Sequence, residues 1–364
     1  MADGGLVFEV EVRADPVPHD VRAAAVADPV FGTVFTDHMV SATWTPSGGW
    51  HDGRVAAYRP MQVSPAAAVL HYAQEIFEGL KAYRHDDGTI WAFRPDRNAK
   101  RFANSARRMA LPELPAADFV ESLKALVRLD QAWVPEARGS EKSLYLRPFM
   151  IALEANLAVR PSQLVRYGVI ASPAGPYFAS GVKPVSIWLS SKHTRAAIGG
   201  TGAAKCGGNY ASSLAAQADA QAHGCDQVVF LDASERTWVE ESGSMNVCLV
   251  YADGRIVTPE LNGAILDGVT RASLLDLASD LGHEVEERRI SIDEWRDGVA
   301  GGAITEVFAC GTAAVVTPVG RLVWDGGEVG SGEVGPVTEM LRAALLDLQF
   351  GRTPDHRGWL TRLA

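Results

Sequence analysis

A lysine set among small residues is the feature of this sequence best suited to covalent chemistry. Lys205 begins the run Lys205–Tyr210, which reads KCGGNY, and Glu241 begins the run Glu241–Asn246, which reads ESGSMN. A neutral amine attacks an aldehyde carbon, glycines let the backbone approach a flat ligand, and a phenol and a carboxylate can tune that ligand. Only the free amine is nucleophilic, so burial or a nearby cation must lower the pKa of Lys205. The two runs favour carbonyl–amine chemistry.

The setting of Lys205 distinguishes it from the other lysines. The chain has seven lysines, and only Lys205 lies between two glycine-rich segments, Gly199–Ala204 and Gly207-Gly208. A solvated lysine in a loop is the ordinary alternative for such a residue. The small residues on both sides favour the reactive amine.

Composition limits what the rest of the chain can be. A length of 364 residues suits two domains, and 47% hydrophobic with 21% charged residues is typical of a soluble globular protein. The net charge of −10 disfavours nucleic acid and anionic membrane surfaces as partners. The sequence shows neither a signal-peptide pattern nor an apolar run of membrane length, which predicts a cytoplasmic enzyme.

The four cysteines indicate neither a metal site nor a disulfide framework. They never occur as C-x-x-C and have no histidines at zinc-ligand spacing, so we expect no bound metal and four small buried side chains. The four are Cys206, Cys225, Cys248 and Cys310.

Strand and helix patterns in the first half predict an α/β domain. Alternating runs around Asp52-Gly53 and Asp87-Gly88 predict two hairpins, and apolar residues at helical spacing predict helices from Asp96 and over 116–133. A strand is expected over 143–147. Turn-forming residues gather between 172 and 181, which is typical of a linker.

The second half alternates strands and helices in the same way. The predicted elements are strands at 185–189 and 227–231, a hairpin at 247–258, and helices at 210–223, 271–281 and 336–350. We therefore predict a smaller N-terminal α/β domain at 1–178, a linker at 179–184, and a larger C-terminal α/β domain at 185–364 that carries Lys205.

Six short motifs follow one another along the chain. They are Phe77–Tyr83, Ser143–Pro148, Lys205–Tyr210, Glu241–Asn246, Gly263–Arg271 and Gly311–Ala314. In this order they resemble the branched-chain amino acid aminotransferases, which are fold-type IV pyridoxal-phosphate enzymes, and the resemblance extends from Phe31 to the last helix. It implies a two-domain α/β fold with mixed sheets and transfer of an amino group between leucine, isoleucine or valine and 2-oxoglutarate, with pyridoxal 5′-phosphate as cofactor.

The resemblance assigns roles to the residues of the first two runs. Lys205 is expected to bind the cofactor's aldehyde carbon and then, as the released amine, to move the proton of the substrate's α-carbon. Glu241 is expected to pair with the pyridine nitrogen and Tyr210 with the 3′ oxygen. The neighbouring Glu240 competes for the first role, since numbering does not say which carboxylate points inward, but the register of the motif favours Glu241.

The cofactor phosphate needs several donors in an acidic protein. By resemblance these are the Arg101 guanidinium, the backbone amides of Val269 and Thr270, and the Thr312 hydroxyl. The two amides lie where a predicted helix begins, and free amides at a helix N-terminus bind anions.

The substrate pocket must accept an apolar side chain in one half-reaction and the carboxylate of glutamate in the other. By resemblance Tyr145 and Arg147 receive that carboxylate, and the backbone around Thr312 and Ala313 receives the α-carboxylate. The apolar lining is expected from Phe31, Tyr72, Phe77 and Tyr177. Ordinary core packing is the alternative for the two phenylalanines.

The resemblance also implies a homodimer. In this family a loop from the partner's smaller domain completes the site, and the matching residues here are Leu157 and Val159, apolar residues in a predicted loop.

Two other interpretations of the sequence stay open. A D-amino-acid aminotransferase or an aminodeoxychorismate lyase would keep Lys205 and Glu241 but lack the Tyr145-x-Arg147 pair and the N-terminal segment with Phe31. A non-catalytic cofactor-binding protein is the more remote interpretation, because every expected catalytic position is present.

Overall fold

Contacts within the chain divide it into two compact units. The computed structural model describes residues 5–137, 139–176 and 182–364. The first unit comprises Met1–Pro176, Ala204–Gly207 and Asp347–Ala364, and the second comprises Tyr177–Ala203 and Gly208–Leu346. The sequence-based division places Lys205 in the C-terminal domain, whereas its short segment packs within the first unit. The reason is local, because the backbone of this segment bonds to that unit.

The first unit is built on one twisted sheet. In the described part of the chain its strands follow the order β1-β3-β2-β8-β7-β5-β6-β18, and β4 also pairs with β7. The elements in chain order are β1 (Glu9–Val10), α1 (His19–Ala27), β2 (His38–Thr45), β3 (Gly49–Ala57), α2 (Ala68–Tyr72), β4 (Glu75–Phe77), β5 (Leu80–Arg84), β6 (Ile90–Phe93), α3 (Pro95–Arg108), α4 (Ala116–Leu129), β7 (Ser143–Ala152), β8 (Val165–Ala174) and β18 (Leu360–Arg362).

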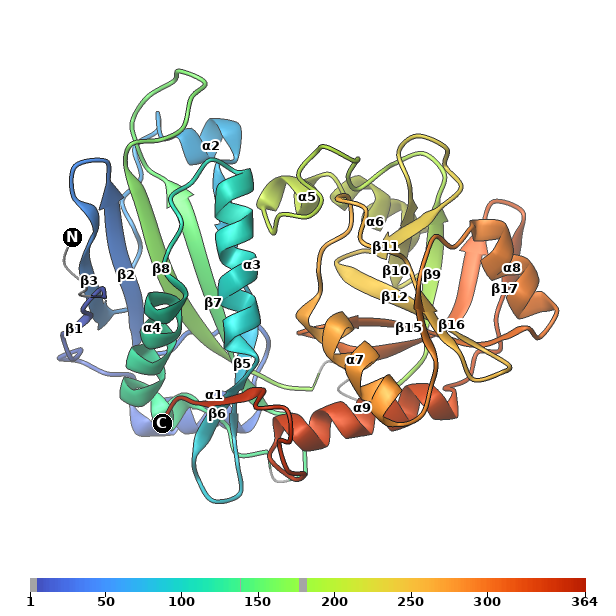
Figure 1. Cartoon of the computed structure of the whole chain (residues 1–364). Coiled ribbons are helices and arrows are strands. Elements are labelled where there is room, and N and C mark those ends of the chain that lie inside the picture. The colour runs from blue at the N-terminus through green and yellow to red at the C-terminus, as the bar shows by residue number, and fades with distance from the viewer. Residues whose placement is uncertain (1–4, 138, 177–181) are drawn as a thin grey trace. The chain divides into compact units, whose positions relative to one another are not determined.

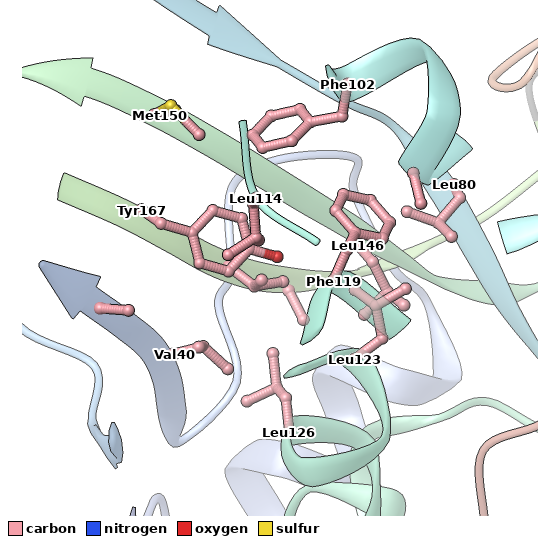
Figure 2. Packing of buried hydrophobic residues seen from close by; sticks show 14 of the residues in the cluster. Val40, Leu80, Phe102, Leu114, Phe119, Leu123, Leu126, Leu146, Met150 and Tyr167 are labelled. Atoms are coloured by element: carbon pink, nitrogen blue, oxygen red, sulfur yellow. The ribbon is translucent and has the colours of Figure 1, made fainter. Parts of the chain in front are cut away.

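Helices α3 and α4 cover one face of this sheet and form the core with it (Figure 1). Phe102 from α3 and Phe119 from α4 pack with Tyr167 of β8, and their ring centroids lie 5.4 to 6.5 Å apart. The apolar stripe of α4, formed by Phe119, Leu123, Leu126 and Val127, is fully buried there. Figure 2 shows the first three of these side chains in the core.

Strand β7 carries core residues on one face and the side chains of Tyr145 and Arg147 on the other. Leu144, Leu146 and Met150 are fully buried in the core of the first unit. Because side chains alternate along a strand, Tyr145 and Arg147 point to the opposite face. The strand is longer than the predicted 143–147, since it continues through Pro148 to Ala152.

The Asp87-Gly88 hairpin is confirmed, but the one predicted at Asp52-Gly53 is wrong. Ala82 pairs with Ala92 across β5 and β6. Asp52 and Gly53 lie inside β3, where the register with β2 shifts and Asp52 has a positive φ of 53°. The dipeptide forms a β-bulge instead, in which these two residues of β3 lie opposite the single residue Ala42 of β2.

The second unit is also built on one mixed sheet. Its order is β11-β10-β9-β16-β15-β12-β13-β14 among the described residues, and β11 pairs additionally with β12, so the strands from β11 to β12 close into a ring. The elements are β9 (Val185–Ser190), α5 (Gly207–Ala211), α6 (Leu214–Ala222), β10 (Gln227–Leu231), β11 (Val239–Ser242), β12 (Met245–Tyr251), β13 (Ile256–Thr258), α7 (Val269–Asp280), β14 (Val285–Glu287), α8 (Ile292–Ala300), β15 (Ile304–Gly311), β16 (Val315–Trp324), β17 (Gly327–Val329) and α9 (Pro336–Gln349).

The predicted helix over 210–223 is two helices, α5 and α6. The break falls at Ser212 and Ser213, whose hydroxyls donate to the carbonyls of Asn209 and Tyr210 over 2.9 and 2.7 Å. Serine hydroxyls that bond nearby backbone carbonyls compete with helical hydrogen bonds. Among the described residues, no helix is both long enough and apolar enough to cross a membrane.

Candidate active site

The backbone around Lys205 is fixed by the first unit. The Phe77 amide donates to the Lys205 carbonyl over 2.9 Å, and the Lys205 amide donates to the Ser105 hydroxyl over 2.9 Å. The next glycine amide, at Gly207, donates to the Glu75 carboxylate. Strand β4 and helix α3 therefore hold the lysine segment, although the residues on both sides of it are glycine-rich.

The side chain of Lys205 lies among aromatic and cationic groups. Its Nζ lies 4.8 Å from the centroid of the Phe77 ring, and the Arg147 guanidinium lies 4.7 Å from the same ring. Burial lowers the pKa of Lys205 to about 8, with the positive charge of Arg101 acting in the same direction and the negative charge of Glu78 opposing both. At pH 7 roughly a tenth of such an amine is neutral, against less than about a thousandth for an ordinary lysine. The sequence-based expectation of a lowered pKa agrees with this environment.

Helix α3 presents a buried polar stripe to this group. Asn98, Arg101 and Ser105 recur at intervals of three and four residues, so they lie on one face of the helix. Each bonds to a neighbouring segment, the first two to Glu78 and the third to Lys205. The adjacent stripe, Ala99 with Phe102 and Ala106, packs in the core. Packing of the apolar stripe therefore sets the direction of the polar one.

Arg101 forms a forked ion pair with Glu78. Nε lies 2.7 Å from one carboxylate oxygen and Nη2 lies 2.8 Å from the other. Burial raises the pKa of Glu78, but the Arg101 charge and its hydrogen bonds outweigh burial and lower it overall. Sequence reasoning missed Glu78, although an acidic residue between Phe77 and Gly79 at the end of a strand was the available signal.

Tyr145 and Arg147 lie together on β7. Arg147 Nη2 donates to the Tyr145 hydroxyl over 2.9 Å, and the Phe31 ring meets the Tyr145 ring edge-on with centroids 5.0 Å apart. A Cβ at Gly79 would overlap the Tyr145 hydroxyl, so that glycine makes room for the phenol. Among the described residues, the buried Nε of Arg147 has no acceptor. An unsatisfied buried donor of this kind fits an anionic ligand group.

Tyr72 lies beside the loop that carries Leu157 and Val159. Its hydroxyl donates to the Leu157 carbonyl over 2.5 Å, and the two loop side chains are 61% and 85% exposed. Tyr177, the remaining residue predicted for the apolar lining, lies outside the described residues.

In the second unit, the two adjacent glutamates of β11 have different surroundings. Glu241 accepts from the Leu266 amide and lies 3.2 Å from Arg195 Nη2. Glu240 accepts one long bond of 3.4 Å from Asn262 at Oε1, while its Oε2 has no partner among the described residues. Burial raises the pKa of Glu240. The Arg195 contact, which sequence reasoning missed, therefore favours a charged Glu241, and burial disfavours a charged Glu240.

Glu241 and Asn246 also hold the segment that leads into the N-terminus of α7. Asn246 pairs with Glu241 across β11 and β12, and its amide donates to the Leu266 carbonyl over 3.0 Å. A Cβ at Gly268 would overlap the Asn246 side chain, so glycine is needed at the residue before the helix. Val269 and Thr270 form the first buried turn of α7. The Glu241 carboxylate and the Asn246 amide therefore both bond to the backbone of Leu266, shortly before α7 begins.

The remaining predicted residues of the second unit lie in short turns and in α5. Thr312 is half-buried and Ala313 is exposed in the turn between β15 and β16, and Gly311 just before them lies close to Met245 of the Glu241 motif. Tyr210 is half-buried in α5. Its neighbour Asn209 bonds Thr201 twice, over 2.7 and 2.8 Å, and so fastens the glycine-rich segment before Lys205.

Comparison with known proteins identifies the family. The model of the class IV amino-transferases matches residues 75–322. A probable branched-chain-amino-acid aminotransferase of Streptomyces coelicolor is 56% identical over 359 residues, which cover 98% of this chain and 99% of that protein. The chain belongs to the class IV aminotransferases.

Further relatives agree with this membership. The branched-chain-amino-acid aminotransferase of Mycolicibacterium smegmatis is 55% identical over 368 residues, which cover all of both chains. A solved branched-chain amino acid aminotransferase of T.th. with pyridoxamine 5′-phosphate is 31% identical, has a TM-score of 0.71, and is matched over 99% of its length by 89% of this chain. The predicted family and the predicted mixed α/β fold class are confirmed.

This class IV aminotransferase shows no metal centre within the described residues, since no group of three or more histidine, cysteine, aspartate or glutamate side chains is arranged to hold an ion. The four cysteines are buried, as predicted, and are free thiols.

The low pKa of Lys205 predicts unusual reactivity in the cofactor-free protein. Acylation of Lys205 by a small anhydride, followed by mass spectrometry, should rise with pH to a plateau with a midpoint of about 8. The amine is protonated and inert below this midpoint and free above it. In urea the midpoint should move to ~10.4, the value for an exposed lysine. A midpoint in the folded protein as high as the ~10.4 of an exposed lysine would contradict the described environment.

Proposed function

We propose that this chain is a branched-chain amino acid transaminase that moves an amino group reversibly between leucine, isoleucine or valine and 2-oxoglutarate. The observation that carries the proposal is the position of Lys205 in the first unit. Its backbone is fixed by hydrogen bonds, and its side chain lies near Arg101 and Arg147, in surroundings that lower its pKa. The names of the relatives that match over their full length support the substrate class.

Pyridoxal 5′-phosphate is the cofactor in this proposal, and the residues of the first unit fit it. A free amine at Lys205 and a fixed guanidinium at Arg101 are the groups needed for its aldehyde and its phosphate. When bound, this cofactor supplies an electrophilic aldehyde carbon and a ring that accepts electrons from the substrate. Lys205 Nζ would hold the cofactor and, as a neutral amine, would accept the proton that leaves the α-carbon of the substrate.

The second unit supplies the groups proposed for the ring and the rest of the phosphate. Glu241 lies 3.2 Å from Arg195 and is assigned to the pyridine nitrogen, whereas the raised pKa of Glu240 makes it the poorer anion. Tyr210 is assigned to the 3′ oxygen. The amides of Val269 and Thr270 and the hydroxyl of Thr312 are assigned to the phosphate, because amides at a helix N-terminus bind anions.

The substrate residues divide between anionic and apolar recognition. The unsatisfied Nε of Arg147 and the Tyr145 hydroxyl are assigned to the side-chain carboxylate of glutamate. The assigned apolar lining is Phe31, Phe77, Tyr72 and Tyr177. The turn at Thr312 and Ala313 is assigned to the α-carboxylate. A phenol next to an arginine can face either kind of side chain, since its ring is apolar and its hydroxyl is not.

We further propose a homodimer, located in the cytoplasm. Leu157 and Val159 are exposed apolar residues in a loop, and such residues mark contact surfaces when they gather. The Tyr72 bond to the Leu157 carbonyl gives this loop a defined conformation for contact with the partner.

The function is tested by spectroscopy of the cofactor-loaded protein. Leucine should bleach the visible absorbance band, and 2-oxoglutarate should restore it with formation of glutamate. Lys205→Ala should abolish the leucine response and lower turnover by roughly 1,000-fold or more, whereas Lys192→Ala, which changes an exposed lysine, should behave as wild type. A response to D-alanine without one to leucine would instead support a D-amino-acid aminotransferase.

The assignment of Glu241 is tested against its neighbour. Glu241→Gln should lower kcat by about 100-fold, which is ~2.7 kcal/mol, because the ring loses the anion that keeps its nitrogen protonated. Glu240→Gln should change kcat by less than about threefold, since a neutral side chain replaces one that burial already disfavours as an anion. Steady-state kinetics with leucine measures both. Equal losses would show that the two carboxylates share the role.

The dimer is tested at the exposed loop. Val159→Asp should raise the dimer dissociation constant by at least ~10-fold in sedimentation velocity, because it places a charge in an apolar contact. Val21→Asp on α1 is the matched control, since Val21 is also exposed, at 53%, and lies outside the loop. The proposed role of the loop is wrong if the two variants dissociate alike.

A further inference from the structure

Glu78 is a fully buried carboxylate to which no role in the reaction has been assigned. Its side chain is 0% exposed, and its two oxygens accept Nε and Nη2 of Arg101 over 2.7 and 2.8 Å. Asn98 Nδ2 adds a third bond over 2.8 Å and the Gly79 amide a fourth over 3.2 Å. The carboxylate is therefore satisfied on both oxygens and has a single orientation.

This pairing fixes the orientation of the Arg101 side chain. Two parallel bonds to one carboxylate set both the plane and the rotation of a guanidinium. Neither of these two bonds uses Nη1. Because the guanidinium is planar and rigid, fixing Nε and Nη2 also fixes the direction of Nη1. The Glu78 amide donates to the Pro148 carbonyl over 2.7 Å, which ties the carboxylate to the sheet, while Arg101 projects from α3. Through the ion pair, the sheet therefore fixes the position of the Arg101 side chain, which projects from helix α3.

Stability alone does not explain a pair in this place. Removing two charges from water costs about as much as their attraction returns, so a buried ion pair contributes little net stability. The same helix carries a second forked pair, from Arg107 to Glu113 over 3.0 and 2.7 Å, on the protein surface. There the side chains are 62% and 48% exposed and the cost of burial is avoided. A contribution to stability therefore does not account for the buried pair of Arg101 and Glu78.

We infer that Glu78 is a positioning residue that holds Arg101 in the orientation required to bind the cofactor's phosphate. The inference rests on the proposed function, in which Arg101 is the phosphate arginine. A guanidinium fixed before the ligand arrives loses less side-chain entropy on binding, and this gain is specific to the phosphate group.

Glu78 also acts on Lys205 through its charge. It is the largest influence that raises the pKa of this lysine, against burial and Arg101, which lower it. Loss of the carboxylate charge is therefore expected to move the pH midpoint for Lys205 acylation below the wild-type value of about 8. A residue that only filled space would leave that midpoint unchanged.

The test compares two ligands that differ only in the phosphate. Cofactor-free Glu78→Gln and its surface counterpart Glu113→Gln are titrated with pyridoxal 5′-phosphate and with pyridoxal. Glu78→Gln should raise the dissociation constant of pyridoxal 5′-phosphate by about 10-fold or more and that of pyridoxal by less than about twofold. Glu113→Gln should change neither. Equal weakening of both ligands, or no weakening of either, overturns the inference.

A second variant covers the case in which Glu78→Gln does not fold, which far-ultraviolet circular dichroism would reveal. Asn98→Ala removes one bond to the carboxylate without changing any charge, and should cause a smaller loss of about threefold that is again confined to pyridoxal 5′-phosphate. An Asn98→Ala loss shared by pyridoxal, or no loss, would also count against the inference. Failure of the wild-type protein to bind pyridoxal 5′-phosphate would overturn the proposed function instead, and is recognised without any variant.

Discussion

The chemistry of the first unit depends on three hydrogen bonds that hold a short segment of chain. Ala204–Gly207 is attached to β4 and α3 through the Phe77 amide, the Ser105 hydroxyl and the Glu75 carboxylate. Glycine-rich backbone on its own has high conformational entropy, so without these bonds Lys205 would sample many positions. With them, the amine is held at a defined position relative to the side chains of α3 and β7.

Electrostatics then determine what the lysine can do. Arg101 and Arg147 place two permanent positive charges near Lys205, and Glu78 offsets part of them. In a chain with a net charge of −10, this local excess of positive charge is a property of the fold and is opposite in sign to the composition. It serves two purposes, because positive charge both lowers the pKa of an amine and attracts phosphate and carboxylate groups. Glu78 opposes the first effect, and the pKa of the Lys205 amine stays at about 8.

The sequence predicts residues that act through their own chemistry and misses those that act through others. Lys205, Tyr145 and Arg147 can be proposed from the sequence because each belongs to one of the six motifs and has a side chain with an obvious task. Glu78, Glu75 and Arg195 escape prediction because their function is a contact with a residue far away in the chain, and periodicity carries no record of such contacts. The Asp52-Gly53 bulge resembles a hairpin in the sequence for the same reason, since only the pairing with β2 distinguishes the two.

Helix α3 shows why both kinds of residue are needed on one element. Its apolar stripe is predictable, since Ala99, Phe102 and Ala106 recur at helical spacing and pack in the core. Its polar stripe has the same spacing one position away, but a sequence in isolation allows that stripe to face water. Its partners, Glu78 just after β4 and the backbone of Lys205, show that this stripe faces the protein interior. Because the core fixes the rotation of the helix, any substitution that repacks Phe102 should also turn Arg101 and Ser105. Stability of the core and geometry of the site are therefore coupled through a single helix, and the site has little freedom to drift while the core is intact.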